Sequence, residues 1–383
     1  MTLYAKKDVA NLLQILTERA ENISPEIMTT VSEVISEVRK NGDEALYKYT
    51  EKFDKIKLNS LYVDEAEKAR LCTLVPDELK EIIDEAAENI YAFHKKQLQN
   101  SWMTNSDGKV MGQLVRPLDS VGLYVPGGTA AYPSSVLMNA IPAKVAGVRK
   151  IKIVTPPKAE GINPAVVYAA KKAGIDEIIS VGGAQAVAAL AYGTKSIERV
   201  DKIVGPGNIF VAMAKKLVFG AVDIDMIAGP SEVLVIADER ANAKYVAADL
   251  MSQAEHDPMA AAILITTSSE LANAVISKIE TQIKELPRHD IIDKSLEKYG
   301  SIVIVDSLDE AVELSNKIAP EHLELSVENP FELLSKVNNA GSIFLGDNAP
   351  EPLGDYFAGP NHVLPTNGTA RFSSALGVDS FIK

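Results

Sequence analysis

The sequence predicts an α/β protein with two Rossmann-like domains, each built on a parallel-rich sheet, together with an N-terminal helical region. From Val121 onward, short β-branched runs alternate with alanine-rich helical segments, and a second set of such runs begins at Glu232. That alternation is typical of βαβ units on a parallel sheet. With 383 residues, of which 46% are hydrophobic, the chain is long enough for more than one core.

The first part of the chain, up to about residue 100, is predicted to be helical because its apolar residues recur at helical spacing. These residues are Val31, Ile35, Val38 and Leu46, followed by Leu79, Ile82, Ile83, Ala86 and Ile90. The run Asn41–Asp43 is polar and contains a glycine, so we expect a turn there.

The later part of the chain supplies the expected strands. Those of one sheet are residues 150–154, 177–181 and 202–204, and those of the other are residues 232–237, 261–265, 301–305 and 342–345. The alanine-rich segments 163–173 and 184–192 are predicted to be helices between strands of the first set.

This order of elements predicts a discontinuous domain organisation. Residues 1–25 are expected to form an N-terminal helical arm, residues 26–120 and 234–378 a first α/β domain, and residues 121–233 a second α/β domain inserted into it. The connections between the two are expected near Pro117–Ser120 and Ala228–Ser231, where proline, glycine and serine interrupt the regular patterns.

Composition excludes several classes of function. The formal net charge of −13, with no long basic run, argues against a protein that binds nucleic acid. No apolar run reaches the length of a membrane span, and Met1–Asp8 contains no apolar core of a signal peptide. The single cysteine, Cys72, excludes an intramolecular disulfide and fits a buried thiol in a reducing cytoplasm.

The segment Ser252–Pro258 is the most informative stretch of the chain. It places Gln253 and His256 three residues apart at the end of a strongly helical segment, and side chains at that spacing share one helix face. An amide oxygen and an imidazole that face the same way can hold a divalent metal, although for one such pair alone a structural histidine beside a solvated glutamine is the better explanation.

Further titratable residues strengthen the metal interpretation. Asp355 lies in a glycine-rich loop that also contains His362, and with Gln253 and His256 it gives a mixed oxygen and nitrogen set suited to zinc. Glu321 and His322 follow a proline that ends a helix, and they are left side by side on a turn for proton transfer.

The other two histidines are expected to lie on the surface. His94 is followed by two lysines on a helix, and His289 lies between Arg288 and Asp290 in a polar loop.

Three glycine turns follow expected strands, at Tyr124–Gly128, Val181–Gln185 and Val204–Asn208. Turns at the carboxyl ends of parallel strands are where open α/β sheets bind ligands. None of the three contains the G-x-G-x-x-G fingerprint, and glycine is also the ordinary residue at such corners. The sequence therefore permits a dinucleotide without establishing one.

The motifs taken together resemble those of the histidinol dehydrogenase family. The segment Ile224–Glu232 and its continuation to Ser252–His256 match the family's signature, and the three glycine turns, Ala319–His322 and Gly354–Pro365 are similar in order and spacing. The resemblance covers essentially the whole chain. It implies a cytoplasmic, homodimeric enzyme that oxidises L-histidinol through L-histidinal to L-histidine with one zinc ion per subunit and two molecules of NAD, in the last steps of histidine biosynthesis.

The resemblance also implies a role for each matching residue. Gln253, His256 and Asp355 would bind zinc, and Glu321 and His322 would be the acid–base pair. These five residues, together with Ser231 and His362, would also contact the substrate. The NAD site would be lined by Tyr124, Gln185 and Asn208.

One departure from the family concerns the C-terminus. The family continues beyond Leu376–Val378 with a small helical domain that supplies a zinc-binding histidine and a substrate-binding glutamate to the partner subunit, and this sequence ends at Lys383. We expect the sequence to be part of a longer protein, the alternative being a short form with impaired activity. A related zinc- and NAD-dependent dehydrogenase of another polyol or amino alcohol, and a catalytically silent scaffold, are the other interpretations.

Overall fold

A computed structural model describes residues 1–4, 9–21, 25–127 and 132–383. Gly128, the last residue of the first predicted glycine turn, lies outside these ranges. The chain forms two compact units. Unit 1 contains residues 1–22, 228–355 and 364–375, and unit 2 contains residues 23–227, 356–363 and 376–383.

Unit 2 contains a parallel sheet in the order β6-β5-β4-β7-β8. Its strands are β4 (Ser120–Tyr124), β5 (Lys150–Val154), β6 (Glu177–Ile179), β7 (Lys202–Val204) and β8 (Asp223–Ile224). Its helices are α2 (Pro25–Asn41), α3 (Asp43–Asp54), α4 (Glu65–Thr73), α5 (Asp77–Lys95), α6 (Pro133–Ala146), α7 (Pro164–Lys172), α8 (Gly183–Tyr192), α9 (Ile209–Val218) and the short η4 (Val378–Phe381).

Unit 1 contains a second parallel sheet in the order β1-β11-β10-β9-β12-β13. Its strands are β1 (Thr2–Tyr4), β9 (Glu232–Ala237), β10 (Ala261–Thr266), β11 (Ser301–Ile304), β12 (His322–Ser326) and β13 (Ser342–Leu345). The helices that accompany it are α1 (Val9–Glu21), α10 (Ala243–Ala254), α11 (Ser269–Gln282), η2 (Ile283–Glu285), α12 (His289–Lys298), α13 (Leu308–Ile318), α14 (Pro330–Leu334), α15 (Glu351–Tyr356) and η3 (Thr369–Arg371).

The central strands of both sheets are apolar on both faces because helices cover both faces. Every residue of β9 and β10 is buried, as expected for parallel strands between two helical layers. On one face Val233 and Val235 pack with α10, and on the other face Leu234 and Ile236 pack with α13. The predicted α/β class with two parallel sheets is confirmed.

The two units differ from the predicted division of the chain. Residues 26–120 had been grouped with 234–378, but they belong to unit 2, and no boundary falls at Pro117–Ser120. The reason is packing: Val31 and Val38 of α2 share a core cluster with Val187 of α8. The apolar spacing of α2 predicts its buried face but not the sheet that this face covers.

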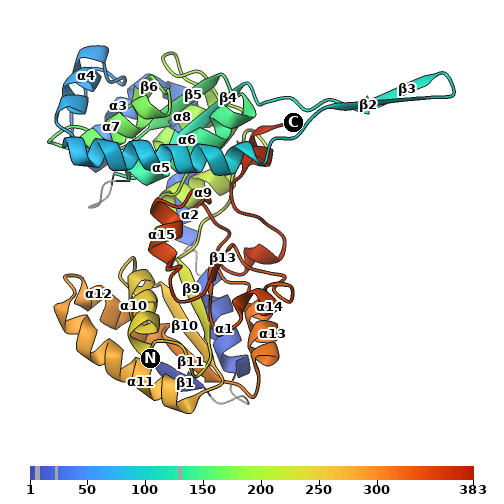
Figure 1. Ribbon diagram of the computed structural model, residues 1–383. Helices are drawn as coiled ribbons and strands as arrows, with labels where there is room; N and C mark the ends of the chain where they lie inside the picture. The colour runs from blue at the N-terminus through green and yellow to red at the C-terminus, as the bar shows by residue number, and fades with distance from the viewer. Residues whose placement is uncertain (5–8, 22–24, 128–131) are drawn as a thin grey trace. The chain divides into compact units, whose positions relative to one another are not determined.

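A β-hairpin was not predicted. Strands β2 (Trp102–Ser106) and β3 (Lys109–Gln113) pair antiparallel with one another only, and every residue in them is exposed. In Figure 1 the hairpin extends away from the sheet and helices of unit 2. Its exposed apolar residues are Trp102, Met103, Val110 and Met111.

His94 is buried, with 0% exposure, and the prediction of a surface position was wrong. It lies one turn after Ile90 on the apolar face of α5. Its Nδ1 donates to the Ile90 carbonyl at 2.8 Å, and its Nε2 accepts from Asn361 Nδ2 at 3.2 Å. The prediction rested on the two lysines that follow it, and these lie beyond the buried face of the helix. His289 is exposed and Cys72 is buried, as expected.

Among the described residues, no helix is long and apolar enough to cross a membrane.

Candidate active site

The predicted acid–base pair lies at the amino-terminal end of β12 in unit 1, beside the start of the neighbouring strand β9. Helix α13 ends at Ile318, Ala319 adopts a left-handed conformation with φ 52°, and Pro320 leads into Glu321. His322 is then the first residue of β12, opposite Val233 of β9 and Ser342 of β13. The pair was expected on a turn, but sheet pairing on both sides holds His322 in a strand.

The main chain of Glu232 orients both members of the pair. Its N–H donates to Glu321 Oε2 at 2.9 Å, and its carbonyl lies 3.0 Å from His322 Nδ1. Because a carbonyl can only accept, Nδ1 carries the hydrogen in this contact. The other ring nitrogen, Nε2, is the one that can exchange a proton with a substrate.

The Nε2 side of His322 faces two carboxylates. Asp355 Oδ1 lies 3.2 Å from Nε2 and Glu351 Oε1 lies 3.8 Å from it. Both acids belong to α15, one turn apart, so Asp355 is helical and the prediction that it lies in a loop was wrong. Gly354 permits this packing, since a Cβ there would lie 2.4 Å from Cε1 of Phe344.

Burial and mutual charge shift the pKa values of this cluster. Burial raises the pKa of Glu321 to about 7 and, with the charge of Asp355, that of Glu351 to about 8. Burial opposes the charge on His322, but the carboxylates of Glu321 and Asp355 outweigh it and raise its pKa to about 10. His322 is therefore charged at neutral pH in this arrangement, and positive charge held at Asp355 would favour loss of its proton.

Gln253 and His256 face one another, as their spacing predicted. Helix α10 ends at Ala254, and the chain turns so that the His256 N–H donates to the Gln253 carbonyl at 3.2 Å. Their side chains meet at 3.3 Å between Gln253 Nε2 and His256 Nδ1. His256 is exposed at the end of this turn, but partial desolvation of its ring lowers its pKa and favours the neutral form that binds metals.

The buried oxygen of Gln253 is the best indication of a cation in this region. Gln253 is 1% exposed, and its Oε1 has no hydrogen-bond partner among the described residues. A buried acceptor without a donor is unfavourable unless a ligand satisfies it. An amide oxygen, an imidazole and a carboxylate are suitable ligands for zinc.

The structure also groups a donor set that was not predicted. His322, Glu351 and Asp355 each offer a ligand atom, and these atoms lie within 4.8 Å of one another. Asp355 is common to both sets, whereas His256 is not part of this compact group. Glu351 was missed because it lies between Pro350 and Pro352, where no helix was predicted that would place it one turn from Asp355.

The residues predicted to line the NAD site all belong to unit 2. Tyr124 ends β4, Gln185 lies in the first turn of α8, and Asn208 is the N-cap of α9. Strand β4 has β5 on one side and β7 on the other, so the strand order reverses at the carboxyl ends of β4 and β7. Such a reversal is the usual ligand site of an open α/β sheet.

Close backbone contacts shape this edge of the sheet. Gly205 has φ 110°, and a Cβ there would lie 2.2 Å from the Tyr124 carbonyl oxygen. The Tyr124 hydroxyl accepts from the Gly183 N–H at 3.0 Å. Gln185 is 1% exposed, and its Oε1 lacks a partner among the described residues, which leaves a buried acceptor for a bound donor such as an amide.

The two remaining predicted substrate contacts lie in different units. Ser231 of unit 1 is half-buried, and its carbonyl accepts from the Ala261 N–H at 3.0 Å. His362 of unit 2 is half-buried, with its ring edge-on to Tyr356 at 6.3 Å between centroids. Their substrate contacts stay predictions.

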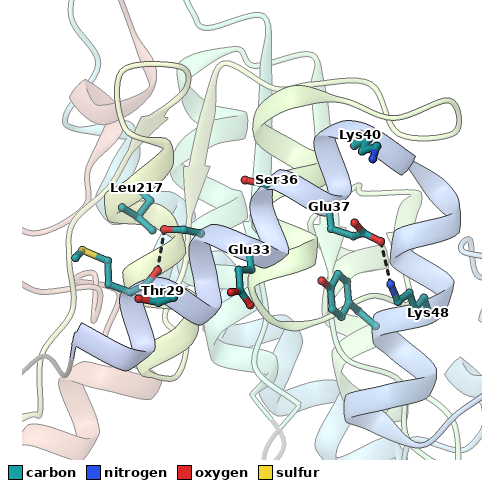
Figure 2. Close-up of a pocket in the computed structure, with 10 residues that line it drawn as sticks. Thr29, Glu33, Ser36, Glu37, Lys40, Lys48 and Leu217 are labelled. Atoms are coloured by element: carbon teal, nitrogen blue, oxygen red, sulfur yellow. Dashed lines mark hydrogen bonds and ion pairs between the residues drawn. The ribbon is translucent and has the colours of Figure 1, made fainter.

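Unit 2 also contains a hollow that is lined by none of the metal or acid–base candidates. It measures about 660 Å³ and is lined by α2, α3 and Leu217, with an ion pair between Glu37 and Lys48 at 2.9 Å at its edge (Figure 2). Its serine and threonine hydroxyls include Thr29 and Ser32, which donate to carbonyls of their own helix. None of the predicted site residues lines this hollow.

Comparison with known proteins gives a consistent result across the chain. Residues 17–383 match the sequence profile of the family described as histidinol dehydrogenase. The chain is 58% identical to the histidinol dehydrogenase of Clostridium acetobutylicum over 378 residues, which are 98% of this chain and 88% of that protein. It is 56% identical to that of Geobacillus kaustophilus over 370 residues, covering 96% and 87% of the two chains.

A solved structure agrees with these sequence matches. The crystal structure of histidinol dehydrogenase from Elizabethkingia anophelis superposes with a TM-score of 0.96 and 41% identity, covering 100% of this chain and 89% of that one. An acetylating aldehyde dehydrogenase from Geobacillus thermoglucosidasius, at 15% identity and a TM-score of 0.51, shares the fold alone.

Proposed function

The chain belongs to the histidinol dehydrogenase family, whose members oxidise histidinol to histidine in histidine biosynthesis, and on that premise we propose how its residues perform the reaction. His322 would accept the proton of the substrate alcohol, and Glu321 would take a proton from the water that adds to the aldehyde. In the second oxidation His322 would again act as base, for the hydroxyl proton of the hydrate. NAD, when bound, would supply the hydride acceptor for each of the two oxidations. The observation that carries this assignment is the orientation of the pair by the Glu232 main chain, which occupies Nδ1 of His322 and directs Nε2 toward Asp355 as the nitrogen that exchanges a proton.

The pKa of Glu321 suits this role, whereas His322, with its pKa raised to about 10, can accept a proton only once positive charge at Asp355 lowers that pKa. With its pKa raised to about 7 by burial, Glu321 can both take and return a proton near neutral pH. At Nδ1, His322 faces the Glu232 carbonyl at 3.0 Å and the Glu321 carboxylate at 3.8 Å, both acceptors, so the tautomer with its hydrogen on Nδ1 is favoured after each transfer. This mechanism uses no cysteine nucleophile, and the thiol of Cys72 is buried.

We assign the zinc ion to Gln253, His256 and Asp355. Zinc held there would bind and orient the polar groups of the substrate. The unsatisfied Oε1 of Gln253 supports the assignment, as does the lowered pKa of His256. Asp355 then lies between the metal and the acid–base pair, 3.2 Å from His322.

We assign NAD to the carboxyl ends of β4 and β7, beside Tyr124, Gln185 and Asn208. The reversal of strand order and the buried acceptor of Gln185 support this position. Gln185→Leu keeps the side-chain volume and removes the acceptor, so it should raise the KM for NAD and leave zinc content unchanged.

The homodimer expected from the family has a candidate contact in the β2–β3 hairpin. A two-stranded ribbon is marginally stable alone, and Trp102, Met103, Val110 and Met111 are exposed on it. Replacing Trp102 and Met111 by serine should shift the mass measured by light scattering from dimer to monomer. A location in the cytoplasm is proposed because Cys72 is free and nothing in the fold requires an oxidising compartment.

The deciding experiment measures product stoichiometry. The purified chain is loaded with zinc and given limiting L-histidinol and excess NAD, and NADH and histidine are quantified. We expect two NADH and one histidine per histidinol. One NADH with accumulated aldehyde would contradict the role of Glu321, and turnover of another amino alcohol with none of histidinol would contradict the substrate.

A further inference from the structure

Arg19 is a buried cation that the sequence did not single out. It lies in the last turn of α1 and is 3% exposed, with its side chain fully covered. Its Nη2 forms an ion pair with the buried carboxylate of Glu232. A buried charge is unfavourable unless it is paired and hydrogen-bonded. The groups that Arg19 contacts therefore indicate its role.

The remaining contacts of Arg19 reach segments that carry the site. Its Nη1 donates to the Met259 carbonyl at 2.9 Å and lies 3.4 Å from the Ser231 carbonyl. Its Nη2 also lies 3.3 Å from Asn367 Oδ1. Met259 follows the Gln253–His256 turn and Ser231 is a predicted substrate contact, so one guanidinium joins segments that are far apart in the sequence.

Glu232 connects Arg19 to the acid–base pair. The carboxylate of Glu232 meets Arg19, and the main chain of the same residue donates to Glu321 and accepts from His322. The Ser231 carbonyl that Arg19 contacts lies in the same planar peptide unit as the Glu232 N–H, so a shift of this peptide would also move the donor to Glu321. All of these residues belong to unit 1.

We propose that Arg19 is a positioning residue for the reaction, which fixes Glu232 so that its main chain holds Glu321 and His322 in their working orientation. The inference rests on the proposed roles of Glu321 and His322. Arg19 touches neither of them, so its effect on catalysis passes through Glu232. A stabilising ion pair alone could lie anywhere in the core, whereas the carboxylate of this pair belongs to the residue whose main chain contacts both reacting side chains.

The test separates catalysis from stability. Arg19→Lys keeps the charge but loses the fork that reaches Glu232 and Met259 together. We expect kcat to fall about 10- to 100-fold, as for small misplacements of catalytic groups, with the KM for NAD within about twofold of wild type and zinc content unchanged. Arg19→Ala should lose more activity and recover part of it when guanidinium ion is added.

A second variant distinguishes loss of positioning from loss of stability. Arg19→Met with Glu232→Met removes both charges and keeps apolar volume, which is often neutral for stability. It should melt near the wild-type temperature and still have the reduced kcat. The matched control is Arg240→Ala, which breaks an exposed ion pair with Glu328 in the same unit and should leave kcat unchanged.

The outcomes distinguish the inference from its premise. If wild type oxidises histidinol and His322→Asn does not, but the Arg19 variants keep kcat within about twofold and only melt earlier, Arg19 is structural and the inference is wrong. If His322→Asn keeps full activity, the acid–base assignment fails and the positioning role fails with it.

Discussion

The Glu232 carbonyl lies 3.0 Å from Nδ1 of His322, and this contact fixes which ring nitrogen is available for proton transfer. Replacing His322 by Asn removes Nε2 and should slow histidinol oxidation about 10²- to 10⁴-fold, the usual contribution of a general base. Single-turnover measurement of NADH tests this. His289→Asn, at an exposed histidine of the same unit, should have no effect.

Glu321 should affect the two oxidation steps unequally. Glu321→Gln cannot accept a proton from water, so oxidation of added histidinal should slow more than oxidation of histidinol to the aldehyde. Rapid-quench analysis of the aldehyde checks this, and equal slowing of both steps would assign Glu321 to orientation of His322.

Zinc content discriminates between the two donor sets that share Asp355. Gln253→Leu should lose zinc to a chelator far more readily than wild type, because a ligand is removed. Glu351→Gln alters only a neighbour of a ligand and should weaken binding by no more than about 10- to 100-fold. Elemental analysis after dialysis measures both variants, and the opposite order would place the metal at His322, Glu351 and Asp355.

Gly354 should tolerate no side chain while Phe344 is present. Gly to Ala ordinarily stabilises a helix by about 1 kcal/mol, but the added Cβ would lie 2.4 Å from the Phe344 ring. Overpacking of this kind costs about 1–3 kcal/mol, so Gly354→Ala should lower Tm and displace Asp355. Combining it with Phe344→Leu should restore part of the loss, and no recovery would show that the contact is not the cause.

His94 should make the protein less stable in mild acid. Burial lowers its pKa below the ordinary value of about 6.5, so the unfolded chain binds a proton that the folded chain does not. The stabilising effect of a neutral His94 is therefore present above about pH 6.5 and is lost as the pH falls below it. Thermal melts from pH 8 to 5 should show a smaller loss for His94→Gln, with His289→Gln behaving like wild type.

The sequence was sufficient for elements with strong apolar runs. Strands β9 and β10 are buried along their whole length, and their apolar runs were sufficient to predict them. Strand β12 was missed because its start was interpreted as a turn after Pro320, although His-Leu-Glu-Leu-Ser alternates polar with apolar residues as strands do. Its polar residues His322 and Glu324 are buried through hydrogen bonds to other segments, which no local pattern reveals.

The candidate site was predictable where residues are close in sequence. Gln253 with His256, and Glu321 with His322, were found from their spacing. Arg19 and Glu351 were not, because their partners are distant or their helix is short. Arg19 gains its importance only from Glu232, Met259 and Asn367, and such long-range pairings exist only after the chain has folded.

The pairing of β1 with β11 also sets an order of events during synthesis. All the sheet strands of unit 2, from Ser120 to Ile224, leave the ribosome before the first central strand of unit 1. Thr2 must wait for Ser301, its partner in the sheet. Since chains emerge N-terminus first, the segment that carries Arg19 stays without its sheet until most of the protein has been made.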